Sequence, residues 1–142
     1  MNFDIEGGCF VIFEFAKDLK QAKCISEKRG DFTQGAIFIS KDKIAVLDKN
    51  KDLSVCNFDG SNAKKVSINR KTTGSTKIEN IYPASLGRVT VQTEDSLFVY
   101  DISARKVISE ITVSDVKQVV WSSNFAYVAV ISKKCKFGMV TR

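Results

Sequence analysis

Two series of short apolar segments recur along the 142-residue chain with one shared period. The first series, FVIFEF, LSVCNF, LFVYDI and FGMVTR, begins at residues 10, 53, 97 and 137, so that its members lie 43, 44 and 40 residues apart. The second series, IFIS, IYPA and VWSS, begins at residues 37, 81 and 120, with spacings of 44 and 39 residues. Two independent series with one period of this length are typical of a β-propeller, in which each four-stranded blade occupies one repeat.

Most of the remaining chain also alternates apolar and polar residues or forms short apolar runs, as strands do. Gly, Asn, Asp, Ser and Lys residues bound these segments. We expect strands near residues 9–15, 35–40, 43–48, 52–58, 63–68, 78–82, 87–92, 96–102, 106–113, 116–121, 125–131 and 136–141. Residues 15–28 could also form a helix, but a strand end, a loop and a further short strand are favoured there. Pro83 falls where a strand ends, so its missing amide donor matters least.

The sequence thus predicts an all-β fold, a partial WD40-like β-propeller of about three blades, each an antiparallel four-stranded sheet. We expect the chain to open in the outer strands of one blade and to close within another. The expected divisions are residues 1–29 for the first partial blade, 30–70 and 75–115 for two complete blades, and 116–142 for the last partial blade. All of them would belong to one propeller.

Each member of the second series places a large aromatic side chain before a small polar break: Phe38, Tyr82 and Trp121. We expect the break to be the hairpin between the first two strands of a blade. The aromatic side chain would then fill the space between neighbouring blades, where its burial stabilises the fold. Trp121, the only tryptophan, is therefore expected in the core rather than as a residue that stacks on a ligand.

Positive charge exceeds negative charge, with 22 basic and 16 acidic residues and a net charge of +6. The densest basic stretch is NRKTTGSTK, residues 69–77, whose composition predicts a loop. Its cations Arg70, Lys71 and Lys77 could contact phosphate groups. A solvated surface loop explains the same residues. One alternative function is thus a basic propeller-like module that binds anionic membrane or RNA.

The residue types argue against an enzyme. The chain has no histidine, which removes Ser-His-Asp and Cys-His nucleophilic sites. Cys9, Cys24, Cys56 and Cys135 are scattered without a C-x-x-C pair, so we expect free thiols and neither a metal nor another cofactor. No apolar run is long enough to cross a bilayer, and no signal peptide is evident, so a cytoplasmic location is expected.

Residues 30–142 resemble the second WD40-type β-propeller of coatomer alpha subunits, components of the COPI vesicle coat. The segments IAVLD, LFVYDISARKV and VSDVKQVVWSS carry most of the resemblance, which covers about four-fifths of the chain. The N-terminal EGGCFVIFEFAKD also resembles the strand that enters this region in the family. The coatomer beta-prime subunit has a related propeller and is the relative with which this one is most easily confused.

The resemblance implies a non-enzymatic scaffold domain that acts in protein transport between the Golgi and the endoplasmic reticulum. It implies other coatomer subunits as partners, with beta-prime foremost, and a peripheral association through the coat with the cytosolic side of Golgi and vesicle membranes. Nucleic acid is not among the implied partners. Dilysine signals are associated with the first propeller of the family, which this chain does not resemble, so no cargo-binding residue is carried over. Because the expected propeller piece has open blade edges, self-association of the chain is a further expectation.

Overall fold

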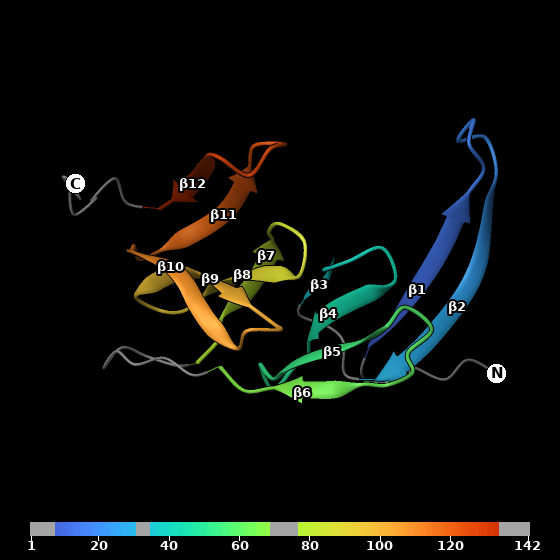
Figure 1. Cartoon of the computed structure of the whole chain (residues 1–142), viewed down its shortest axis with the longest axis horizontal. Helices are drawn as coiled ribbons and strands as arrows, with labels where there is room; N and C mark the ends of the chain where they lie inside the picture. The colour runs from blue at the N-terminus through green and yellow to red at the C-terminus, as the bar shows by residue number, and fades with distance from the viewer. Residues whose placement is uncertain (1–7, 31–34, 69–76, 134–142) are drawn as a thin grey trace. The chain divides into compact units, whose positions relative to one another are not determined.

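The structure, a computed structural model, describes residues 8–30, 35–68 and 77–133 of the chain (Figure 1). All regular secondary structure within these residues is β-strand, and every strand pairing is antiparallel. The all-β expectation is therefore confirmed. The chain divides into two compact units, Met1–Val66 and Ser67–Arg142, and each is described by itself.

The first unit contains a hairpin and a four-stranded sheet (Figure 1). The strands of the hairpin are β1 (Gly8–Phe15) and β2 (Ala22–Gly30). The sheet follows chain order with β3 (Gly35–Phe38), β4 (Lys43–Leu47), β5 (Leu53–Asn57) and β6 (Lys64–Val66). The hairpin confirms that residues 15–28 form a strand end, a loop and a second strand rather than a helix.

The second unit repeats these two components in the opposite order (Figure 1). Its four-stranded sheet consists of β7 (Asn80–Pro83), β8 (Arg88–Gln92), β9 (Ser96–Asp101) and β10 (Lys106–Thr112). A two-stranded sheet follows, made of β11 (Val116–Trp121) and β12 (Val128–Ser132). Pro83 is the last residue of β7, as expected from its missing donor.

The two sequence series occupy equivalent strands. Members of the first series form β1, β5 and β9, and β5 and β9 are the third strands of the two four-stranded sheets. Members of the second series begin in the last residues of β3, β7 and β11 and continue into the turns that lead to β4, β8 and β12. The last member, FGMVTR, and the strand expected at 136–141 lie outside the described residues. By this equivalence, β1 and β2 correspond to the third and fourth strands of a full sheet, and β11 and β12 to the first and second.

Apolar side chains hold each hairpin or strand pair against its neighbouring sheet. In the first unit, Phe10 of β1 packs with Ile44, Val46 and Cys56 of β4 and β5, and Ile12 joins this cluster from β1. In the second unit, a cluster around Leu97, Val113 and Val119 also includes side chains of β7, β11 and β12. Both clusters lie between successive strand groups, which is how blades of a propeller pack.

Two of the three expected inter-sheet aromatics are in that position. Tyr82 of β7 and Trp121 of β11 both pack in the cluster around Leu97, between the four-stranded sheet and the β11–β12 pair. The expectation is wrong for Phe38, whose side chain is 54% exposed. Phe38 pairs with Ile44 and so shares the sheet face that packs against β1. On that side the described residues include only β1 and β2. They include no strand that would contact Phe38 as β8, through Thr90, contacts Trp121.

The strand expected at 125–131 begins later than its composition indicates, because Phe125 belongs to the turn before β12. Its backbone has φ +56, and its N–H donates to the carbonyl of Ser122 at 2.9 Å. The Asn124 side chain accepts the N–H of Ala126 at 3.1 Å, which closes the turn further. Local hydrogen bonds therefore override the strand propensity of this aromatic residue.

Candidate interaction surfaces

A polar contact joins β8 to β11 in the second unit. The indole N–H of Trp121 donates to Thr90 Oγ1 at 2.9 Å, and the Thr90 hydroxyl donates in turn to the carbonyl of Pro83 at 3.0 Å. Thr90 is buried, so that each of these bonds replaces one that water would otherwise supply. The contact fixes the ring of Trp121 against β8.

Gln92 makes a second link two residues further along β8. Its Oε1 accepts the hydroxyl of Tyr82 at 2.5 Å, and its Nε2 donates to the carbonyl of Val116 on β11 and to the carboxylate of Glu79, both at 3.3 Å. Burial raises the pKa of the Tyr82 hydroxyl above its ordinary value, against a smaller opposite effect of its hydrogen bond from Asn80. Tyr82 therefore stays a neutral donor to Gln92 at physiological pH. We call Thr90 and Gln92, with the partners Trp121 and Val116, the β8–β11 clasp.

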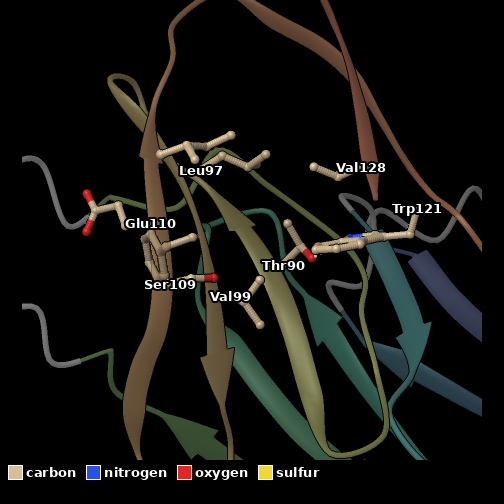
Figure 2. Close-up of a pocket in the computed structure, with 9 residues that line it drawn as sticks. Thr90, Leu97, Val99, Ser109, Glu110, Trp121 and Val128 are labelled. Atoms are coloured by element: carbon tan, nitrogen blue, oxygen red, sulfur yellow. Dashed lines mark hydrogen bonds between the residues drawn. The ribbon is translucent and has the colours of Figure 1, made fainter. Parts of the chain in front are cut away.

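A small pocket of about 70 Å³ lies beside the clasp. Figure 2 shows Thr90 next to the indole ring of Trp121, whereas the carboxylate of Glu110 points away from both. The residues around the pocket are mostly apolar: Thr90, Leu97, Phe98, Val99, Ser109, Glu110, Ile111, Trp121 and Val128. Pockets that bind small molecules are several times larger. The volume of this pocket is therefore too small for a typical small-molecule ligand.

The expected anion-contact residues are only partly described. Arg70 and Lys71 lie outside the described residues. Lys77 is exposed and stands directly before Ile78, whose side chain is buried, and the N–H of Glu79 donates to the carbonyl of Gln92 at 2.7 Å. The cation thus lies at the surface where the chain enters the second sheet. An anion site formed by these three cations stays a prediction.

The parts of the chain that the structure describes gather no cluster of metal-binding side chains. No group of three or more Cys, Asp or Glu side chains converges in residues 8–30, 35–68 and 77–133. Cys9 and Cys24 are exposed free thiols, and Cys56 is a buried one whose pKa is raised, chiefly by burial. Cys135 lies outside the described residues. Nor do the described residues include a helix with the length and apolarity that crossing a bilayer requires.

One exposed surface was missed in the sequence. All side chains from residue 13 to residue 25, which make up the far half of the β1–β2 hairpin, are exposed. They include the large apolar side chains of Phe13, Phe15, Leu19 and Ile25. The available signal was the leucine between Asp18 and Lys20, in a segment with turn character where a polar residue is usual.

Comparison with known proteins identifies the family. The family model described as the COPA/B second beta-propeller matches residues 6–140. Coatomer subunit alpha of Dictyostelium discoideum is 30% identical over 134 residues, which are 94% of this chain and 10% of that protein. Coatomer subunit alpha-1 of Oryza sativa subsp. japonica is 28% identical over 132 residues, 92% of this chain and 10% of that protein. Coatomer subunit alpha of Saccharomyces cerevisiae is 28% identical over 113 residues, which are 77% of this chain and 8% of that protein.

The chain thus spans about a tenth of the length of these curated relatives. No solved structure matches it. The repeat period, the two four-stranded antiparallel sheets and the match over residues 6–140 agree with one another. This chain belongs to the family of coatomer second β-propellers and is homologous to coatomer subunit alpha over most of its length.

Proposed function

We propose that this chain is a non-enzymatic interaction domain of a COPI vesicle coat and acts in protein transport between the Golgi and the endoplasmic reticulum. The observation that carries the proposal is the family match over residues 6–140, to which coatomer alpha relatives from three organisms add. The absence of histidine from the chain also speaks against most nucleophilic enzymes.

The packing of the second unit suits such a role. Its sheets are joined by an apolar cluster and by the two hydrogen-bonded links of the β8–β11 clasp. A frame held in this way can present its turns and outer strands to a partner with little loss of conformational entropy. We propose other coatomer subunits as the partners, beta-prime foremost, and a cytoplasmic location with peripheral association at Golgi and vesicle membranes.

We also propose that residues 30–70 and 75–115 are two complete blades and that residues 1–29 and 116–142 belong to two further ones. The sheets β3–β6 and β7–β10 lie within the two central ranges, which supports the proposal. The clusters that join β1 to β4 and β5, and β7 and β9 to β11 and β12, are the contacts expected at blade boundaries.

Assembly with coat subunits tests the function directly. The protein that carries this chain is tagged at its own locus, purified from its source cells, and its bound proteins are identified and quantified. We expect the other coatomer subunits in stoichiometric amounts, together with Golgi localisation by microscopy. A control cell line carries Leu86→Ser, a substitution at an exposed residue of the β7–β8 turn. Its protein should recover the same subunits as the parent. Purification without any coatomer subunit would overturn the proposal.

A further inference from the structure

The pocket beside the β8–β11 clasp lies between the four-stranded sheet of the second unit and the β11–β12 pair. Leu97 and Val99 of β9 line it from the sheet, and Trp121 and Val128 line it from the pair (Figure 2). Its small volume and mostly apolar lining suit one apolar side chain rather than a ligand. The first unit shows which side chain belongs in such a place.

The equivalent place in the first unit is filled. Phe10 and Ile12 of β1 pack there with Ile44 and Val46 of β4 and with Cys56 of β5. Cys56 is only 4% exposed, and it comes from the third strand of the sheet that follows β1 and β2. In the second unit, the described residues include no third strand beside β12 that could supply its counterpart.

Four of the five members of the filled cluster have counterparts in the second unit. The repeat and the strand pairing relate Phe10 to Leu97, Ile12 to Val99, Ile44 to Val128 and Val46 to Val130. Three of these counterparts, Leu97, Val128 and Val130, do pack in one apolar cluster. The fifth member, Cys56, corresponds to Val140 in the segment FGMVTR, which lies outside the described residues.

The length of chain after β12 fits a third strand in that segment. Phe137 follows Ile131 of β12 by six residues, just as Leu53 of β5 follows Leu47 of β4. A turn of the same length therefore brings a strand that begins at Phe137 alongside β12. Its register would be that of β5 on β4, because both sheets would start from equivalent residues.

That register determines which side chains face the pocket. Cys56 lies opposite Ile44 in the first unit, so Val140 would lie opposite Val128. Since successive side chains of a strand point to opposite faces, Val140 would face β9 and Met139 would face away from it. A valine at this position would close the apolar cluster as Cys56 does.

A hydroxyl group is also in place for the end of such a strand. On β2, the hydroxyl of Ser26 donates to the carbonyl of Phe58 at 2.6 Å. Ser109 has the same position on β10 by strand pairing, and it lines the pocket. Phe58 corresponds to Arg142 in the repeat. A third strand in the register of β5 would thus give the Ser109 hydroxyl an equivalent acceptor.

We propose that residues 137–141 form a third strand beside β12, with the side chain of Val140 in the pocket and the Ser109 hydroxyl donating to the carbonyl of Arg142. The pocket is then an acceptor site for a segment of this chain. The inference rests on contacts within the two units and on the repeat, and it does not depend on the proposed transport function. The competing occupant is the same segment of a second copy.

Disulfide formation in the full chain tests the register. Serine replaces the native cysteines other than the buried Cys56, and cysteine is placed at both Val128 and Val140. Directly opposed residues of an antiparallel pair lie close enough for a disulfide. We expect this pair to oxidise roughly tenfold faster than the control pair Val128→Cys/Met139→Cys, whose second Cβ points to the other face. Peptide mapping by mass spectrometry should find the bond within one chain. Equal rates, or a bond between two chains, would overturn the proposal.

Trp121 gives an independent reading, because it is the only tryptophan and it lines the pocket. Val140→Asp would bring a charge to an apolar site, so it should shift the emission of Trp121 to longer wavelength and lower the urea midpoint. Val140→Ala should produce a smaller shift in the same direction. Thr141→Asp is the matched control, since β9 carries Asp101 at the equivalent position, and it should change neither value. Equal effects of Val140→Asp and Thr141→Asp would show that the Val140 side chain lies elsewhere.

Discussion

Trp121 and Thr90 lie 31 residues apart in sequence and are joined by a hydrogen bond of 2.9 Å from the indole N–H to the threonine Oγ1. The same tryptophan ring packs in the apolar cluster around Leu97, and its centroid is 5.9 Å from that of Phe125. One side chain thus links the four-stranded sheet to the β11–β12 pair by both polar and apolar contact. The stability of the second unit should depend on it.

Truncating that side chain separates its two contributions. Trp121→Ala should lower the free energy of unfolding by about 3 kcal/mol, the lower end for a large aromatic, because the ring is only partly buried. Trp121→Phe keeps most of the packing and loses the hydrogen bond, so we expect about 1 kcal/mol. Urea denaturation measures both. Tyr127→Ala, at an exposed aromatic in the adjacent turn, is the control and should cost under about 0.5 kcal/mol. Equal losses of unfolding free energy for Trp121→Ala and Tyr127→Ala would show that the β8–β11 clasp does not stabilise the second unit.

Sequence patterns predicted this region well because they reflect local strand geometry. The period-two alternation of LFVYDI and its counterparts identified third strands, and the spacing identified their equivalence. The same patterns could not show that Thr90 and Gln92, polar residues in an apolar strand, bind Trp121 and Val116. Such partners depend on which elements meet in space, which the alternation does not encode.

Pairing also explains what was missed or mistaken elsewhere. The strand expected within residues 15–28 was expected to be short because AKCISEKRG, residues 22–30, has little apolar alternation. It is longer because its backbone pairs with β1 from end to end. The sequence around Phe38 resembles that around Tyr82 and Trp121, which pack between sheets. Phe38 is nevertheless exposed, because no strand equivalent to β8 lies opposite it among the described residues. The exposure of residues 13–25 likewise follows from where the packing of β1 on β4 and β5 ends, at Ile12. In each case the deciding contact is remote in sequence.

A substitution at Gly60 tests the contact between β2 and the β5–β6 turn. Its φ is +86, and a Cβ added there would stand 2.7 Å from Lys28 Cδ. Gly60→Ala should therefore destabilise by more than the roughly 1 kcal/mol that the left-handed conformation alone costs an alanine. Gly87→Ala is the matched control, since φ is +76 and nothing lies within 4 Å of its added Cβ. Thermal denaturation measures the stability of both single variants and of the double variant Gly60→Ala/Lys28→Ala. In the double variant the clash is relieved, so its loss of stability should fall to that of Gly87→Ala. No difference between the two single variants would argue against the contact with Lys28.

Acid should weaken the fold through Asp101. Hydrogen bonds from the backbone of Ala104 and from the side chain of Arg88, which is 3.2 Å away, lower the pKa of this carboxyl below its ordinary value. Because the folded pKa is the lower one, the charged form stabilises the fold above the unfolded pKa, about 3.9 for aspartate. That stability is lost as the pH falls through the folded value. Melting temperatures across this range should decline less steeply for Asp101→Asn than for the parent chain, and Arg88→Gln should give an intermediate slope. Parallel curves for all three proteins would show that the Asp101 contacts do not contribute.

The basic segment 69–77 provides the last prediction, which concerns binding rather than folding. Of its candidate anion-binding residues only Lys77 is described, and it is exposed. If Arg70, Lys71 and Lys77 bind lipid phosphates, changing all three to glutamine should weaken binding to phosphatidylserine vesicles and make it less dependent on salt. On single-stranded RNA the slope of log affinity against log salt should fall by about 0.7 for each phosphate that the variant no longer neutralises. A triple variant with unchanged affinity and slope would show that these cations do not contact phosphates.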